Sequence, residues 1–562
     1  MNSEIPAAPP RLIGARSGFS VLYHDKFLLS RVDPVRQAER AALAALPLAP
    51  RTLYLIPSPL LGYGIPLIIA ALPPDSALLC VEADAALAEL SREHIAALQA
   101  ASDSRLSFVR TAKPNAVCAF VNQVWGRRRF RRVEIIRLSG GWQLNAGFYE
   151  AAAEALRTAI ATDWYNAITL SKLGRLYIKN AIRNLPLLAR GSGIENLDFG
   201  SRPVVVFGAG PSFDTFFDSL GRAMLPEACV KVCVDTALRP LLERNVEPDL
   251  VVALDAQHWN LRDFCGAGCR RLPVAMDMSA PPAVSGVLGG DSRIFWTRWT
   301  DLGLFERLTA LNLMPLELPP LGSVGLSAVN LALRLGSGPV FTVGIDLAFT
   351  LDKYHCRGSP SHGEILRRHN RFGALFPASA AFRQACTPVS SSAEGEGGLV
   401  WRDDPVMRRC RSLFDDEFAG TGRVFAVEGG AYLGVETLSP EAALEKIYVS
   451  AAHCPGSVPA VCGGPGGDQA RAVTLLDFIK NEEAVLGELL GVLKGEREAA
   501  RERLDSLLDS AGYLWAHFPD CAGAGGRRPS SGDIVFLRRV RAEIEPFIRL
   551  WESARRRIMP PV

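Results

Sequence analysis

The chain has 562 residues, of which 48% are hydrophobic and 22% charged, and this length is too great for a single hydrophobic core. A net charge of +3, from 62 basic and 59 acidic residues, excludes the strong basic excess of a dedicated nucleic-acid binder. The composition therefore predicts a globular protein of about three domains.

No part of the chain reads as a targeting or membrane segment. The amino terminus lacks the basic and apolar regions of a signal peptide, so we expect a cytoplasmic protein. Residues 52–74 carry no charge, but their prolines and glycines would break a helix, so we expect no membrane span. The pairs Cys229/Cys233 and Cys265/Cys269 have no neighbouring histidine to complete a zinc pattern, and we read them as reduced thiols.

The first predicted domain, residues 1–190, begins as a smaller Rossmann-like half. Strands are expected at 53–56 and 77–81, with a Gly/Pro loop and an apolar helix at 65–72 between them. Glu82 ends the second strand at the spacing of a ribose-binding carboxylate. Because proline removes amide donors from the loop, we expect a scaffold without a working cofactor site.

Two features lead toward the middle of the chain. The arginine-rich run 127–132 is read as a solvated turn before a strand at 133–138, with a phosphate or partner contact as the alternative. Residues 151–185 form a long helical stretch. The Gly, Ser, Asn and Asp residues of 191–203 then indicate a linker.

The second domain, 191–452, alternates strands with helices, which predicts an α/β fold with a mostly parallel, doubly wound sheet. The strands are expected at 204–207, 230–234, 250–254 and 340–343. Ligands bind such sheets at the carboxyl ends of the strands.

The loop Gly208-Ala209-Gly210-Pro211-Ser212 joins the first of these strands to a helix. Glycines allow close approach of the backbone, and the amides at a helix start attract a phosphate. Ser212 could cap the helix or donate to the phosphate. The loop therefore predicts a nucleotide site, with a tight packing turn that holds no ligand as the alternative.

The third domain, 453–562, starts with a linker rich in glycine and proline at 453–468. Helical periodicity follows at 470–508 and 532–557. We expect a helical module that packs on the body of the protein or on another subunit, which leaves a homo-oligomer open.

Several segments of the chain, taken together in order and spacing, resemble one protein family. They are the 208–212 loop, the run 232–242 with Asp235, Glu247-Pro248-Asp249, Leu254-Asp255, Gly322-Ser323-Val324-Gly325, Gly344-Ile345-Asp346, Lys353-Tyr354-His355, Glu428-Gly429-Gly430-Ala431, and a preceding helix with Tyr177, Asn180, Asn184 and Pro186. The family is that of the motility-associated glycosyltransferases, also called the motility accessory factor or MptE-like domain family. The resemblance covers about 200–440 and extends to bacterial sialyltransferases, which share a G-N-G-P-S loop.

The resemblance implies that the central domain has a sialyltransferase-like fold and that the protein is an enzyme. Its activity would be transfer of a nonulosonic acid, of the pseudaminic or legionaminic type, from a CMP-activated donor to Ser/Thr of flagellin, in support of flagellar assembly and motility. The CMP-sugar would be a substrate, with no permanently bound cofactor, and Mg²⁺ could take part.

The site residues follow from the same motifs. The donor-binding set would be Gly208, Gly210, Pro211, Ser212, Asp235, Asp255, Gly322, Ser323 and Gly344. Asp346 and His355 would be catalytic, since a histidine can exchange a proton near neutral pH. His258 and His362 are weaker candidates. Ala209 departs from the family loop, where asparagine stands, and this puts the identity of the donor in question.

Two other functions remain open. A pterin pyrophosphokinase would use ATP and Mg²⁺, with Asp235, Asp249 and Asp255 as metal ligands. A flagellin-binding assembly factor would keep only a vestigial nucleotide site. Residues 363–394 could be a lid, an acceptor platform or an insertion.

Overall fold

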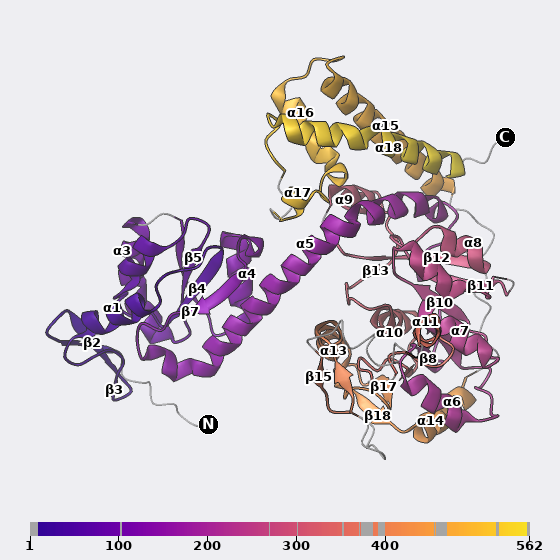
Figure 1. Cartoon of the computed structure of the whole chain (residues 1–562), viewed down its shortest axis with the longest axis horizontal. Coiled ribbons are helices and arrows are strands. Elements are labelled where there is room, and N and C mark those ends of the chain that lie inside the picture. Colours follow the sequence, from indigo (N-terminus) through magenta and orange to yellow (C-terminus); the bar gives the residue numbers. More distant parts are fainter. Residues whose placement is uncertain are drawn as a thin grey trace. The chain divides into compact units, whose positions relative to one another are not determined.

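The computed structural model describes residues 9–101, 104–268, 270–300, 302–350, 353–369, 371, 386–391, 400–454, 456, 469–523 and 528–558. The chain divides into two compact units (Figure 1). The first holds Met1–Lys172 with Ala516–Pro529, and the second holds Leu173–Trp515 with Ser530–Val562. Within the described ranges, no helix is both long and apolar enough to cross a membrane.

The first unit contains the predicted Rossmann-like sheet. Its four strands are all parallel and lie in the order β6-β5-β4-β7. They are β4 (Thr52–Pro57), β5 (Ala77–Glu82), β6 (Leu106–Arg110) and β7 (Arg132–Ile135), and the helices are α1 (Pro34–Ala44), α2 (Ile65–Ala71), α3 (Ala85–Ala101), α4 (Pro114–Val124) and the start of α5 (Ala146–Leu188). Alternate residues of β4 enter separate cores on the two faces, with Leu53 and Leu55 on one and Tyr54 and Ile56 on the other.

The Gly/Pro loop that follows β4 packs against the amino-terminal segment of the chain. The small antiparallel sheet β1 (Arg11–Gly14), β2 (Phe19–Tyr23) and β3 (Lys26–Phe27) leads into Leu28, which packs in a core with Leu60 and Leu61 of the Gly/Pro loop. Glu82 is fully buried and accepts hydrogen bonds from the Tyr149 hydroxyl at 2.9 Å and the Asp84 amide at 3.1 Å. The predicted ribose-binding carboxylate is therefore buried and bonded to Tyr149 and Asp84.

The arginine-rich run serves the first unit internally. Arg127 pairs with Asp163 at 2.8 Å, and Arg129 donates to the carbonyl of Pro74 at 2.9 Å. The guanidinium of Arg131 lies 3.6 Å from the ring centroid of Trp164. These contacts tie the turn at η1 (Arg127–Arg129) to its surroundings, so the run is more than a solvated turn.

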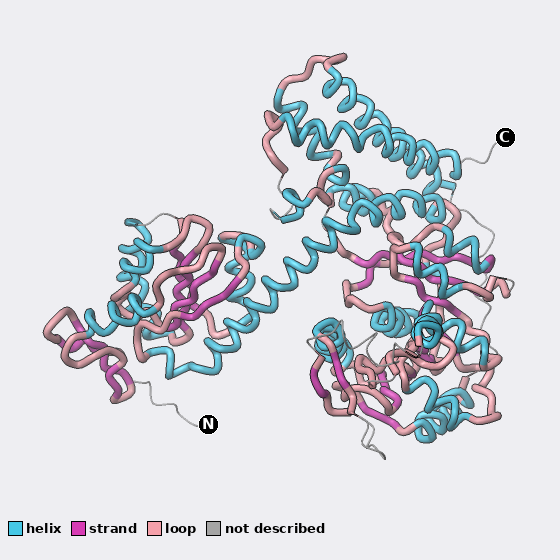
Figure 2. Tube along the Cα trace, in the orientation of Figure 1, coloured by secondary structure: helices cyan, strands magenta, loops and turns pink. Residues whose placement is uncertain are grey.

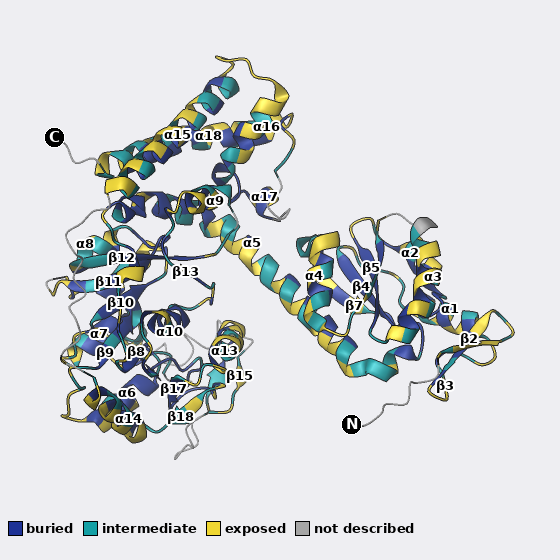
Figure 3. Cartoon of the chain, turned by 180° about the vertical axis from the view of Figure 1, so that it is seen from behind, coloured by how far each residue is buried: buried dark blue, intermediate teal, exposed yellow. Residues whose placement is uncertain are grey.

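The second unit is built on a nine-stranded sheet in the order β13-β12-β11-β10-β9-β8-β14-β17-β18, with every neighbouring pair parallel. The strands are β8 (Val204–Phe207), β9 (Val230–Val234), β10 (Leu250–Ala253), β11 (Leu272–Asp277), β12 (Gly289–Thr297), β13 (Glu317–Leu318), β14 (Val340–Val343), β17 (Val424–Val427) and β18 (Glu436–Leu438). The central strands are buried throughout (Figure 3). The predicted doubly wound α/β fold is confirmed.

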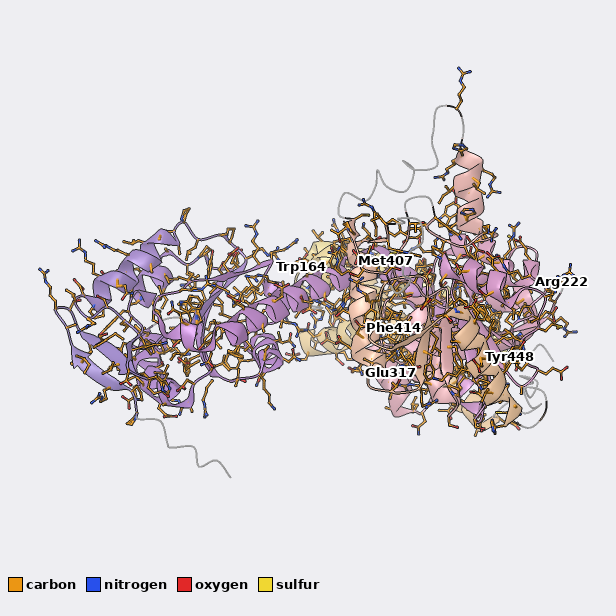
Figure 4. The ribbon with its side chains drawn as sticks, turned by 90° about the horizontal axis from the view of Figure 1, so that it is seen from below. Trp164, Arg222, Glu317, Met407, Phe414 and Tyr448 are labelled. Carbon is orange, nitrogen blue, oxygen red and sulfur yellow. The ribbon has the colours of Figure 1, made fainter. Side chains whose placement is uncertain are left out.

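Helices lie on both sides of this sheet (Figure 2). They include α6 (Ser212–Leu220), α7 (Asp235–Glu243), α8 (Ala283–Leu288), α10 (Val324–Leu335), α11 (Pro360–Arg368), α13 (Pro405–Phe418), α14 (Pro440–Ala452) and the 3₁₀ segment η4 (His258–Phe264). The chain first runs from β8 to β9 on one side of β8, and later returns as β14 on the other side of β8. Because both crossovers are right-handed, α6 and α10 lie on opposite faces of the sheet. Met407 and Phe414 mark α13 in Figure 4.

Three long helices complete the second unit: α15 (Gln469–Lys494), α16 (Arg501–Ser510) and α18 (Ile534–Ile558). Buried Glu482 of α15 pairs with Arg307 of α9 (Gly303–Ala310) at 2.6 Å and accepts from the Tyr513 hydroxyl at 3.0 Å. The helical module therefore packs on the body of its own chain through a buried, fully bonded carboxylate. The boundary between the two units falls inside α5, while the three predicted domains remain a prediction.

Candidate functional site

The sheet of the second unit has its topological switch point between β8 and β14. Ligands of doubly wound sheets bind in the crevice outside the carboxyl ends of the strands at this point. The loop Gly208–Pro211 follows β8 and the segment Gly344–Asp346 follows β14, so strand pairing brings two of the predicted motifs side by side.

The glycines of these two segments let their backbones touch. A Cβ atom on Gly208 would lie 2.4 Å from the Gly344 carbonyl oxygen, and one on Gly210 would lie 2.5 Å from a carboxylate oxygen of Asp346. Gly344 has a φ of +73°, which other residues rarely adopt. Close packing by itself therefore requires glycine at all three positions.

Asp346 occupies the amino end of helix α6, where the sequence predicts a phosphate. The Ser212 amide donates to its carboxylate at 2.8 Å, and the Ser212 hydroxyl donates to the second oxygen. Burial raises the pKa of Asp346 to about 7, against the opposing effect of these bonds. The helix start at 208–212 is thus filled by an acid of the chain, and Ser212 serves Asp346 instead of capping the helix.

The Glu428–Ala431 segment completes the packing around Asp346. The Ala431 amide donates to the Asp346 carbonyl at 2.8 Å. A Cβ atom on Gly430 would lie 2.5 Å from the Asp346 Cα atom, so only glycine fits there. The four-residue motif is a packing element that holds the end of β14.

The amino end of helix α10 lies beside the same switch point and has a different environment. Gly325 is close enough to Ile345 that an added Cβ atom would be 3.5 Å from its Cδ1 atom. Ser323 is the N-cap residue, and its side chain makes no capping hydrogen bond. The first-turn amides of a helix have no partner within the helix, so this end offers donors and a positive dipole to an anion.

Three aspartates line the carboxyl ends of β9, β10 and β11: Asp235, Asp255 and Asp277. Burial and the neighbouring charge of Asp255 raise the pKa of Asp235 to about 8. Burial raises the pKa of Asp277 to about 6. Asp255 is exposed and accepts from the Asn260 amide at 2.5 Å. The structure thus brings predicted residues Asp235 and Asp255 together and adds Asp277.

Asp249 lies at the opposite edge of the sheet. It precedes β10 and pairs with Lys231 near the start of β9, with 2.8 Å between the Lys231 Nζ atom and the carboxylate. The predicted metal site of Asp235, Asp249 and Asp255 is therefore wrong. Asp249 lies at the amino end of β10, whereas Asp235 and Asp255 follow the carboxyl ends of β9 and β10, and the length of the strands separates them. The described part of the chain contains no group of three acidic, histidine or cysteine side chains placed to hold a metal.

The segment that carries His355 lies directly on the 208–212 loop. The Cys356 amide donates to the Ala209 carbonyl at 2.8 Å, and the Tyr354 and His355 rings lie 4.7 Å apart. His355 is half-buried. The structure therefore places the predicted catalytic histidine at the switch point, beside the other motif residues.

Asp214 of α6 anchors this segment, a role that the sequence analysis missed. Its buried carboxylate lies 2.6 Å from Lys353 Nζ, accepts from the Arg357 amide at 2.9 Å, and pairs with Arg244. Although burial opposes it, these bonds lower the pKa of Asp214. In the sequence, an aspartate in the first turn of a helix indicates only a favourable interaction with the helix dipole. Its role as an anchor could not be predicted, because its basic partners lie far along the chain.

The helix before the domain also has a defined task. Asn180 donates to the carbonyls of Ala256 at 3.1 Å and Ser279 at 2.9 Å, and Asn184 donates to those of Met278 and Ala280, both at 2.9 Å. The two amides lie one helical turn apart and fix the segments that follow β10 and β11. They hold the aspartate-bearing edge in place.

Comparison with known proteins agrees with this geometry. Residues 179–352 match the family model described as 6-hydroxymethylpterin diphosphokinase MptE-like. Over 571 aligned residues the chain is 28% identical to an uncharacterized protein of Treponema pallidum (strain Nichols), covering 98% of this chain and 96% of that protein.

A solved structure shares the fold. The MAf glycosyltransferase from Magnetospirillum magneticum AMB-1 matches with a TM-score of 0.53 and 14% identity, over 99% of this chain and 93% of that one. The predicted resemblance to the motility accessory factor and MptE-like family is thus confirmed for the domain and the fold. The match extends beyond the MptE-like domain to nearly the whole chain.

The role of Asp214 in the MptE-like domain can be tested by proteolysis. We expect Asp214→Asn to release the segment 353–357, because the amide cannot balance the lysine and two arginines that converge on it. Tryptic cleavage after Lys353 and Arg357 should accelerate about tenfold, which corresponds to the loss of roughly 1.4 kcal/mol. Limited digestion followed by mass spectrometry measures both rates.

Asp218→Asn is the matched control, because this carboxylate lies on the same helix and reaches Arg357 only at 3.4 Å from an exposed position. It should leave cleavage unchanged. Equal protection of both sites in the Asp214 variant would show that the ion pairs do not hold the segment.

Proposed function

We propose that the chain is a glycosyltransferase that moves a nonulosonic acid from its CMP-activated form to Ser/Thr hydroxyls of flagellin. The observation that carries the proposal is the switch point, where the start of α10 lies beside Ile345 and the His355 segment is bonded to the 208–212 loop at the carboxyl ends of the strands. The fold shared with a protein that is itself described as a MAf glycosyltransferase supports the reaction class.

The donor phosphate is assigned to the amino end of α10. The start of α6 is already occupied by Asp346, whereas Ser323 makes no capping hydrogen bond and the first-turn amides of α10 have no partner within their own helix. We assign these groups to the single phosphate of a CMP-sugar. Gly322 lies beside Ser323 with a φ of +72°, so the turn into the helix can approach a ligand closely. Asp235 and Asp255 would accept hydrogen bonds from hydroxyl or amino groups of the donor.

His355 is the proposed proton acceptor. The acceptor hydroxyl oxygen attacks the anomeric carbon of the sugar, the bond from that carbon to the phosphate oxygen breaks, and CMP leaves with the electron pair. His355 takes the hydroxyl proton or supplies one to the leaving phosphate. Asp346 acts indirectly, because its buried carboxylate fixes the loop on which the His355 segment rests. Assays with and without EDTA show whether Mg²⁺ takes part.

Ser323→Ala tests the assigned phosphate position. We expect this variant to bind CMP about tenfold more weakly, because a hydroxyl donor to a charged phosphate is lost. Isothermal titration with CMP measures the change. Ser439→Ala is the control, since Ser439 caps α14 by accepting from the Ala442 amide at 3.2 Å and should affect stability but not CMP binding. Unchanged CMP affinity in Ser323→Ala contradicts the assignment.

Transfer itself is tested by intact-mass analysis of flagellin. The purified chain, CMP-pseudaminate or CMP-legionaminate, and unmodified flagellin should yield a mass increase of one sugar per modified site. No increase with either donor, from protein that binds CMP, would refute the transferase proposal and leave a flagellin-binding assembly factor.

A second candidate follows from the description of the family model, a pterin diphosphokinase. It would require ATP and a metal, and Asp249 cannot join Asp235 and Asp255 because it lies at the other edge of the sheet. Formation of AMP from ATP in the presence of the pterin would favour this activity over glycosyl transfer.

A further inference from the structure

Two adjoining cavities lie between η4 and α11 in the second unit. Their volumes are about 680 Å³ and 380 Å³, and both are lined by Arg262, Cys265, Glu364 and Arg367. η4 follows β10 and α11 follows β14, so these walls stand at the carboxyl edge of the sheet, where substrates approach. The bridge from Arg262 to Glu364, at 2.8 Å, joins the two walls.

The cavity walls carry an excess of positive charge. Glu364 is shared by Arg262 and Arg368, and Arg239 pairs with Glu243 at 2.9 Å. Within the described residues, Arg367 has no carboxylate partner although it lines both cavities. A guanidinium in such a position is a ready donor pair for a planar acid group.

An apolar surface lies next to this charge. Trp259 of η4 lines the larger cavity and is 67% exposed, with the His258 ring 4.6 Å from its own. A tryptophan face covers the apolar side of a sugar ring or of a short peptide. The cavity thus offers the guanidinium of Arg367 to an acid group and the ring of Trp259 to the apolar part of the same ligand.

We propose that the cavities between η4 and α11 bind a carboxylate-bearing ligand, with the acid group on Arg367 and its apolar face on Trp259. The choice of carboxylate over phosphate rests on the proposed function, in which the phosphate of the donor lies at α10. The carboxylate can then come from an acidic sugar or from an acidic side chain of the acceptor polypeptide. Both sources share the same contact with the guanidinium.

Cys265 provides a reporter inside the proposed site, because its thiol is free, exposed and part of both cavity walls. Alkylation of Cys265 in the full chain is followed by tandem mass spectrometry, with half-buried Cys454 as an internal reference outside the cavities. We expect N-acetylneuraminate or a glutamate-containing peptide to slow alkylation of Cys265 alone. The source that protects at the lower concentration is the one the site recognises.

Arg367→Ala should weaken this protection about fivefold, as expected for an exposed charged contact. Arg222→Ala is the control, since Arg222 is an exposed arginine of the same unit that lines neither cavity (Figure 4). Equal protection by N-acetylglucosamine or by inorganic phosphate would overturn the proposal, as would full protection in Arg367→Ala. The readout needs no transfer and no CMP, so its failure is distinct from failure of the proposed function.

Discussion

Replacing Asp346 with alanine should lower the free energy of unfolding by about 3 kcal/mol, because a buried amide and hydroxyl lose their acceptor together. Both groups belong to Ser212, at the first turn of α6. The carboxylate also faces the positive end of the helix dipole, so its removal leaves that end uncompensated. Hydrogen exchange over residues 207–220 and chemical denaturation measure the loss.

Two further variants separate the causes of this effect. Asp346→Asn keeps the shape and one acceptor oxygen, so it should cost no more than about 1 kcal/mol. Asp218→Ala removes an exposed carboxylate from the same helix and should change stability by less than about 0.5 kcal/mol. If the alanine variant at 346 exchanged as slowly as the wild type, the bonds to Ser212 would not matter for stability.

Asp235→Asn should make the protein more stable at pH 8, by at most about 5 kcal/mol, since the pKa rise is about four units and each unit corresponds to about 1.4 kcal/mol. Burial raises the pKa of Asp235 from 3.8 to about 8, so the folded state holds a proton that the unfolded state releases. Stability contributed by this group is therefore greatest at low pH and falls as the pH rises from about 4 to about 8. The asparagine variant should show a flatter profile.

Denaturation midpoints measured between pH 5 and pH 9 test this expectation. Part of the slope should persist in the variant, because burial also raises the pKa values of Asp277 and Asp346. Asp218→Asn, at an exposed position, should leave the profile as in the wild type. A variant at 235 that is less stable than the wild type at pH 8 would show that Asp235 is ionised and paired in the folded protein.

A stability cost of this kind agrees with the proposed donor-binding role of Asp235, because perturbed pKa values cluster at functional sites. Among the described residues Asp235 has no basic partner and accepts a hydrogen bond from the Thr236 amide at 2.8 Å, and a buried acid of this kind beside exposed Asp255 is typical of catalytic and binding sites. If Asp235 contacts the donor, Asp235→Asn should gain stability and lose CMP-sugar affinity at the same time, which stability measurements alone would not reveal.

Much of the fold could be read from local patterns. The strands expected at 204–207, 230–234 and 340–343 have the same bounds in the structure, because their β-branched and aromatic runs end in glycine or aspartate. The other five strands of this sheet were missed, β11 and β12 among them. β11 has a proline at its second position and β12 begins Gly-Gly-Asp-Ser, and both features weaken a strand signal.

The sequence alone determined that Asp235, Asp255 and Asp346 lie at the carboxyl edge of a doubly wound sheet, because each follows a predicted strand. It could not decide which helix start is free. Ser212 and Asp346 are separated by 134 positions, and only the pairing of β8 with β14 brings them into contact. That pairing turns the predicted phosphate loop at 208–212 into a packed, internally bonded turn. We therefore propose the amino end of α10 as the place where an external anion binds.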